Sequence, residues 1–193
     1  MIKKLKKVQD LTKNIEWPSV LMSLIFIGLG IFLINHLSFT YPVTELSILL
    51  GLIAILKGFF NFYTYSVVTE ISKEQHWQWS FIVSASVSIL TGLLLIFNFS
   101  SNGLVFYLLG GAWMIFDTIP HILAVMDYCT KHSNTYKMLL TAYGLSILMG
   151  IGLIFNNIYP LIETTIYLSS FFLINGVILI WDIYSVNKKQ RAM

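Results

Sequence analysis

Three residues that could take part in acid–base chemistry lie in one apolar run near the middle of the chain. The run Leu108 to Leu123 reads LLGGAWMIFDTIPHIL and carries Asp117, Pro120 and His121. In a helix, Asp117 and His121 would be four residues apart and share one face. Pro120 would leave the carbonyl of Phe116 without its usual backbone donor. A carboxylate, an imidazole that titrates near physiological pH and a freed carbonyl could together sense or relay a proton.

A lysine and an asparagine hold related places in two other apolar runs. Lys57 lies 59 residues before Phe116, and Asn175 lies 59 residues after it. This alignment puts Lys57, Phe116 and Asn175 at one depth. The positions that follow them also align: Gly58, Asp117 and Gly176. Because an ionisable group inside a bilayer costs about 2.5 to 3.5 kcal/mol on insertion scales, we predict that Lys57 pairs with Asp117.

Two interpretations of this candidate polar cluster (Lys57, Asp117, His121 and Asn175) stay open. In the structural one, a Lys–Asp pair fixes helix register, Pro120 is an ordinary kink and His121 reaches interfacial water. In the functional one, the cluster binds a proton or a ligand. Lys57 could also extend toward the membrane surface, in which case Asp117 would sit protonated.

The composition predicts a membrane protein. Hydrophobic residues make up 56% of the 193-residue chain and charged residues only 11%, whereas a soluble domain has about 25% charged residues. A bilayer core of about 30 Å needs roughly 20 apolar residues per helix, and six runs meet that need. We place them at about 17–35, 43–66, 77–98, 104–126, 137–156 and 161–185.

The predicted fold is therefore an all-α integral membrane protein with six transmembrane helices. The transmembrane domain spans 17–185, between a basic N-terminal tail, 1–16, and a basic C-terminal tail, 186–193. No small-residue cleavage pattern follows the first run before the second, so we interpret it as a retained anchor and not a cleaved signal.

The basic residues predict the orientation in the membrane. Of the twelve Lys and Arg residues, five lie in 1–16, one in the loop after the second run, two around the loop after the fourth and three in the C-terminal tail. The three loops on the other side contain none, and the twelfth residue is Lys57. The positive-inside rule then places both termini in the cytoplasm. The expected partner is the lipid bilayer, not nucleic acid.

The six runs form three tandem hairpin repeats, at about 17–66, 77–126 and 137–185. Tyr41-Pro42 recurs as Tyr159-Pro160, and the Leu-Leu-Gly that ends at Gly51 recurs 59 residues later at Gly110. All three hairpins have the same orientation, unlike the inverted repeats that many secondary transporters use.

Small residues recur in the odd-numbered runs at spacings that suit close helix packing, because short side chains let helix backbones approach in lipid. The predicted packing positions are Gly28, Gly30, Ser84, Ser88, Gly92, Ala142, Ser146 and Gly150.

Taken together, these features resemble the HdeD family of acid-resistance membrane proteins, which are small six-span proteins built from three hairpin repeats. The resemblance covers about 17–185. The sequence departs from the family pattern in its second repeat, which lacks the outer proline and has Asp117 where the other copies have glycine. The residues that carry it are Trp17, Trp79, Gly28, Gly30, Gly92, Gly150, Gly152, Pro42, Pro160, Gly51, Gly110, Gly58 and Gly176.

The resemblance implies a stress-related multi-pass protein of the bacterial inner membrane, with no catalytic residues to carry over. The sequence itself has a single cysteine, Cys129, and histidines without metal-ligand spacing, so we expect neither a metal nor a cofactor. Short outer loops leave no room for an extramembrane catalytic domain, so we expect no enzyme. A homo-oligomer or a membrane-protein partner is possible. The alternative function is a small proton or solute channel or transporter that uses Lys57, Asp117 and His121.

Overall fold

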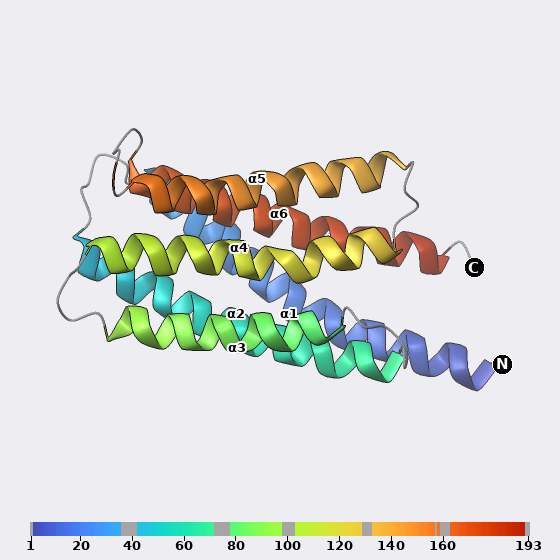
Figure 1. The fold of residues 1–193 in the computed structure, drawn as a ribbon. Helices are drawn as coiled ribbons and strands as arrows, with labels where there is room; N and C mark the ends of the chain where they lie inside the picture. The colour runs from blue at the N-terminus through green and yellow to red at the C-terminus, as the bar shows by residue number, and fades with distance from the viewer. Residues whose placement is uncertain are drawn as a thin grey trace.

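The chain folds into six long helices, which confirms the predicted fold class (Figure 1). The computed structural model describes residues 2–35, 42–71, 78–97, 103–128, 133–156, 158 and 163–191, and no strand occurs among them. The helices are α1 (Ile2–Asn35), α2 (Val43–Ile71), α3 (Gln78–Ile96), α4 (Gly103–Tyr128), α5 (Asn134–Asn156) and α6 (Thr164–Arg191).

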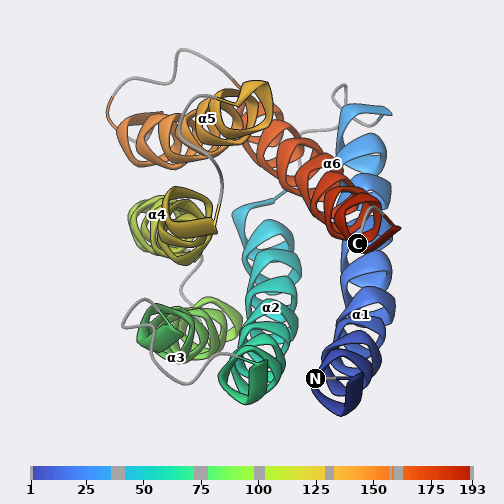
Figure 2. The same ribbon diagram turned by 90° about the vertical axis from the view of Figure 1, so that its right-hand side faces the viewer.

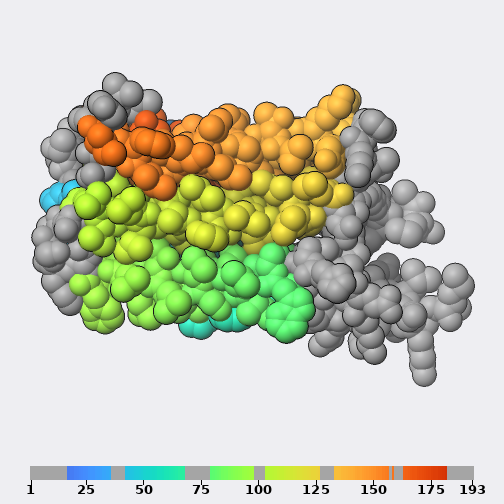
Figure 3. Space-filling model, viewed as in Figure 1, coloured from blue at the N-terminus to red at the C-terminus, as the bar shows by residue number. Residues whose placement is uncertain are grey.

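Each helix contains a segment that is long and apolar enough to cross a bilayer. Large apolar side chains also cover the outside of the bundle, where a soluble protein would carry charges; examples are Leu94, Leu108 and Leu148, which are 46–58% exposed. Figure 3 shows α3, α4 and α5 packed side by side along one such face. The chain is therefore a multi-pass membrane protein that lies in a lipid bilayer.

The predicted helix boundaries hold within a few residues at most ends, but the first helix begins earlier than predicted. α1 has 34 residues, about 51 Å at 1.5 Å per residue, and continues through 2–16, where good helix formers predominate. Pro18 thus lies inside the helix and not in its first turn. Figure 1 shows both termini at one end of the bundle, here called the terminal end. The opposite end is the hairpin end.

The helices form a closed ring in which the closest neighbours are not the predicted hairpin partners. The most extensive contacts join α2 to α3, α4 to α5 and α1 to α6, and Figure 2 shows this arrangement from the terminal end. The spans of α2, α4 and α6 bury 44–50% of their residues, against 28–39% for α1, α3 and α5. The even-numbered helices therefore supply most of the interior.

Glycine lets the backbones touch within these three pairs. A Cβ on Gly92 would lie 2.5 Å from the carbonyl oxygen of Gly51, and one on Gly111 would lie 2.5 Å from that of Gly150. In the third pair, a Cβ on Gly30 would lie 2.6 Å from a side-chain carbon of Leu173. Gly30, Gly92 and Gly150 thus lie at helix crossings, where a side chain would push the helices apart.

One predicted packing position is wrong. Gly28 is exposed, and a Cβ there would meet nothing within 4 Å. It lies outside the face of α1 that contacts α6, where Gly30 provides the close approach. Of the other predicted positions, Ser84, Ser88 and Ser146 are fully buried, and Ala142 packs against the apolar cluster of Leu139 and Tyr143.

We predict that alanine at Gly111 destabilises the bundle, because its Cβ would overlap the backbone of α5. Overpacking of this kind costs about 1 to 3 kcal/mol, so the purified variant should unfold at a lower temperature in detergent. Gly144→Ala is the matched control, since a Cβ there meets nothing within 4 Å. Tryptophan fluorescence during heating measures both. Equal unfolding temperatures for the two variants would contradict the close crossing.

Candidate functional site

The glycine contacts define the register that places the polar cluster. The carbonyl oxygens that face Gly92, Gly150 and Gly30 belong to Gly51, Gly111 and Ser169. Counting six residues onward from each of these three gives Lys57, Asp117 and Asn175. These three residues are therefore structurally equivalent.

The predicted alignment is wrong by one residue in α4. It put Phe116 level with Lys57, but Phe116 is 46% exposed, whereas Asp117 is 1% exposed. The error arose because α4 carries two adjacent glycines. The repeated Leu-Leu-Gly sequence aligns Gly51 with Gly110, whereas the residue of α4 that contacts Gly150 of α5 is Gly111. Asp117 is thus the counterpart of Lys57 itself and not of Gly58.

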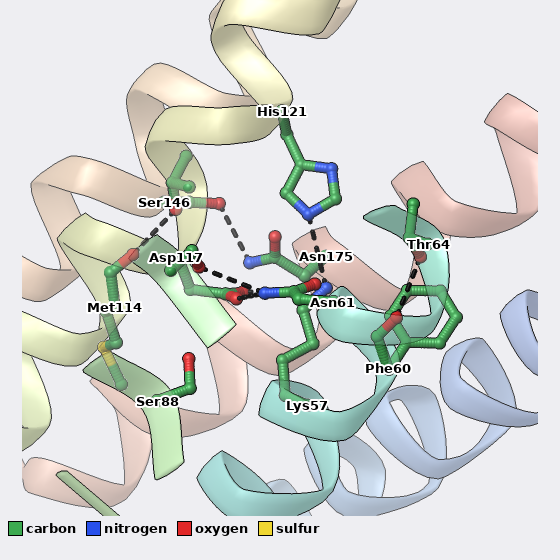
Figure 4. A network of polar contacts seen from close by, with 12 residues as sticks. Lys57, Phe60, Asn61, Thr64, Ser88, Met114, Asp117, His121, Ser146 and Asn175 are labelled. Carbon is green, nitrogen blue, oxygen red and sulfur yellow. Dashed lines mark hydrogen bonds and ion pairs between the residues drawn. The ribbon is translucent and has the colours of Figure 1, made fainter. Parts of the chain in front are cut away.

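The predicted ion pair is present. The Lys57 ammonium Nζ lies 3.7 Å from the Asp117 carboxylate Oδ2, and the two side chains are 2% and 1% exposed. The same Nζ lies 3.3 Å from Nε2 of His121 (Figure 4). The structure therefore brings together Lys57 from α2 with Asp117 and His121 from α4.

The chemistry of the ammonium fixes the state of His121. A charged lysine has three N–H donors and no acceptor, so Lys57 donates and Nε2 of His121 accepts. This contact requires the neutral imidazole with its hydrogen on Nδ1.

Aromatic rings enclose the charged groups. Lys57 Nζ lies 5.7 Å from the ring centre of Phe26 and 5.1 Å from that of Phe60, within the range of cation–π attraction. The His121 ring stacks on Tyr143 at 5.6 Å and meets the edge of Phe81 at 5.5 Å. Lys57 and Asp117 are only 2% and 1% exposed behind these rings, so their charges interact more strongly than they would at a surface.

Asn61 completes the cluster and was not predicted. Its Nδ2 donates to Oδ1 of Asp117 at 2.9 Å and to Oγ of Ser84 at 3.1 Å, so it ties α2 to both α3 and α4. The sequence offered one signal for this role: Asn61 lies four residues after Lys57, so the two side chains share one helix face. Oδ1 of Asn61 and Oδ2 of Asp117 are buried and have no hydrogen-bond partner among the described residues.

Asn175 lies near this cluster but bonds elsewhere. Its Nδ2 donates to Oγ of Ser146 at 3.1 Å and to the carbonyl of Phe171 at 2.9 Å. The predicted cluster is therefore joined only in part, since no described hydrogen bond links Asn175 to Lys57 or Asp117. The predicted packing serines also act as acceptors, because Trp113 Nε1 donates to Ser88 at 3.0 Å.

Apolar layers separate the cluster from the hairpin end. One turn away, the ring centres of Trp113 and Phe171 lie 5.6 Å apart, and Ile53 joins them in the core. Leu50 and Leu168 form the next layer, and a Cβ on Gly110 would lie 2.8 Å from Leu50. All these side chains are at most 3% exposed. By contrast, His121, one turn from Asp117 toward the terminal end, is partly exposed.

The arrangement holds a buried ion pair and can bind a proton. Among the side chains that the structure describes, no three His, Cys, Asp or Glu groups lie close enough to hold a metal ion. The ligand that suits a neutral imidazole and a carboxylate oxygen without a hydrogen bond is a proton.

Six spans around a buried ion pair define a multi-pass membrane protein with a polar centre. Within it, residues 21–97 match the family model described as a short repeat of unknown function (DUF308). The match covers less than half of the chain and comprises the C-terminal part of α1 together with α2 and α3. No curated protein and no solved structure matches the chain.

We predict that Lys57 and Asp117 are energetically coupled. Asp117→Asn would leave the ammonium buried without a counter-charge, which costs about 3 to 5 kcal/mol, whereas removal of both charges is often nearly neutral. The double variant Lys57→Met with Asp117→Asn should therefore be more stable than Asp117→Asn alone. Thermal unfolding in detergent gives the comparison.

Glu45→Gln is the control for this pair. It makes the same acid-to-amide change at an exposed carboxylate in the first turn of α2, so we expect little effect. If the two changes at Lys57 and Asp117 simply add, the ion pair does not hold the two helices together.

Proposed function

We propose that this protein is an HdeD-like inner-membrane protein that contributes to acid or envelope stress tolerance. The observation that carries the proposal is the match of residues 21–97 to a repeat family that includes HdeD-like membrane proteins. Three similar glycine-mediated crossings, each between neighbouring hairpins, support a threefold repeat of the kind that such proteins contain. The role is one of membrane organisation or partner binding, without catalysis.

The proposed orientation has both termini in the cytoplasm. Eight of the twelve basic residues lie in 1–16 and 186–193, and both segments belong to the terminal end of the bundle (Figure 1). Positive charge near transmembrane ends favours the cytoplasmic side. The membrane is proposed to be the bacterial cytoplasmic membrane, with a second copy of the chain or another membrane protein as the partner.

A second candidate is a proton or solute channel, and the buried Lys57, Asp117 and His121 favour it. Intramembrane ionisable groups often mark transport paths. The apolar layer of Trp113, Phe171 and Ile53 argues for the first proposal, because these residues close the space that a path to the hairpin end would need.

The stress role predicts a survival defect. A strain that lacks this gene should survive an acid challenge less well than its parent, and the wild-type gene should restore survival. Colony counts after acid exposure measure the effect, with the same strains at neutral pH as the control. Equal survival of the deletion strain and its parent in acid would refute the stress role.

The absence of conduction is tested separately. Purified protein in liposomes under a pH gradient should show no proton flux above that of empty liposomes, measured with a trapped pH-sensitive dye. The Asp117→Asn variant should give the same baseline. Flux through the wild-type protein that Asp117→Asn alters would favour the channel instead.

A further inference from the structure

We propose that the cluster of Lys57, Asn61, Asp117 and His121 is a one-sided proton-binding site, in which His121 takes up a proton from the terminal end of the bundle and passes it no further. This inference deepens the proposed function by naming the ligand and its side of entry, and it rests on the non-conducting membrane role.

The first step of the argument concerns the accepting atom. Nε2 of the neutral His121 ring holds a lone pair that accepts the hydrogen bond from Lys57 Nζ at 3.3 Å. A proton from hydronium forms an N–H bond at Nε2 and leaves water behind. The protonated ring has two donors and no acceptor, so the hydrogen bond from Lys57 must break.

The second step concerns the charges after uptake. An ammonium and an imidazolium would then face each other where only one carboxylate, Asp117, provides compensation. Asp117 Oδ2 lacks a hydrogen-bond partner and lies 3.7 Å from Lys57 Nζ, so it is available to the ammonium that His121 releases. Uptake therefore replaces a Lys–His contact by a tighter Lys–Asp contact and frees the imidazole to move.

The third step concerns the side of entry. His121 is partly exposed, whereas Lys57 and Asp117 are 2% and 1% exposed. His121 lies one turn from Asp117 toward the terminal end, and the polar Asn61 and Ser84 lie beside the cluster. Toward the hairpin end the next core side chains are Trp113 with Phe171 and then Leu50 with Leu168. The indole N–H of Trp113 is bound to Ser88, and the other three side chains have no polar atom that could relay a proton.

Few other titratable groups face His121. Lys57 approaches from α2, Asp117 lies one turn away on α4 itself, and Tyr143 stacks on the ring from α5. Tyr143 keeps its phenol hydrogen throughout the acid range. The cluster meets Phe81 and Ser84 from α3 and Phe26 from α1, none of which titrates in this range. Ile178 of α6, which packs in the apolar cluster with Tyr143, does not titrate either.

The first test measures whether His121 is the proton site. Acid should lower the unfolding temperature of the wild-type protein in detergent by several degrees between pH 7.5 and pH 5, because the folded protein holds His121 neutral against Lys57, whereas the unfolded chain can protonate this histidine in that range. His121→Gln keeps an acceptor oxygen but cannot titrate, so it should lose most of this acid-induced shift. His132→Gln, which removes a different histidine, should behave like the wild type.

An acid-induced shift that persists in His121→Gln would overturn the assignment. If His121→Gln does not fold, nitrogen NMR of the histidine rings in the wild-type protein replaces it. Because the Lys57 ammonium opposes a second proton on the His121 ring, the change from one protonated nitrogen to two should come late as the pH falls from 7.5 to 4. A ring that stays neutral across this range also overturns the proposal.

The second test measures the side of entry. In a Cys129→Ser background, His121→Cys should react with a membrane-impermeant thiol reagent only from the side of the terminal end. Inverted vesicles and spheroplasts expose the two sides in turn. Ile53→Cys, in the apolar layer, is the matched control and should react from neither side. Reaction of His121→Cys from the hairpin side, or from neither side, overturns one-sided entry.

These results separate the proton site from the stress role. If both tests succeed but the deletion strain survives acid normally, the proton site stands and the stress role fails. If the deletion strain is acid-sensitive but His121→Gln keeps the wild-type acid response, the stress role stands and the proton site fails.

Discussion

The interior of this bundle depends on one constraint, the charge of Lys57. An ammonium at 2% exposure must find compensation inside the protein, because the lipid offers none. Asp117 supplies the opposite charge, His121 supplies a lone pair, and the Phe26 and Phe60 rings supply their electron-rich faces. These partners come from three helices, so the position of one side chain restrains α1, α2 and α4 at once. Asn61 extends the restraint to α3 through Ser84.

The glycine crossings make this arrangement possible. Lipid gives helices no hydrophobic reason to associate, so close backbone contact must supply much of the attraction. The contact of Gly51 with Gly92 packs α3 against α2, and the contact of Gly111 with Gly150 packs α5 against α4. The even-numbered helices then direct their buried faces toward one another. The same crossings fix the register, so the depth of Lys57 and Asp117 follows from contacts near the hairpin end of their helices.

Much of this could be predicted from the sequence, and the failures have physical causes. Six spans and the pairing of Lys57 with Asp117 follow from composition and from the cost of burying charge, which are properties of single residues. The register of α4 was wrong by one residue because Gly110 and Gly111 look alike in sequence and only their neighbours distinguish them. Gly28 was misassigned for a similar reason, since a glycine does not reveal which face of its helix is covered. Asn61 was missed because its role depends on partners 23 and 56 residues away.

The equivalence of Lys57, Asp117 and Asn175 also explains why the three even-numbered helices had to differ at this layer. Three identical charged side chains at equivalent positions would repel one another in a medium of low dielectric constant. Three identical apolar ones would give a plain core, like the neighbouring layer of Ile53, Trp113 and Phe171. Only unlike side chains, here a cation, an anion and an amide, can place a neutralised ion pair at the centre of a bundle with threefold-related contacts. Divergence of the repeats at this layer is therefore a physical requirement of the site, and the carboxylate that α4 carries at the position equivalent to Lys57 is what lets Lys57 be buried.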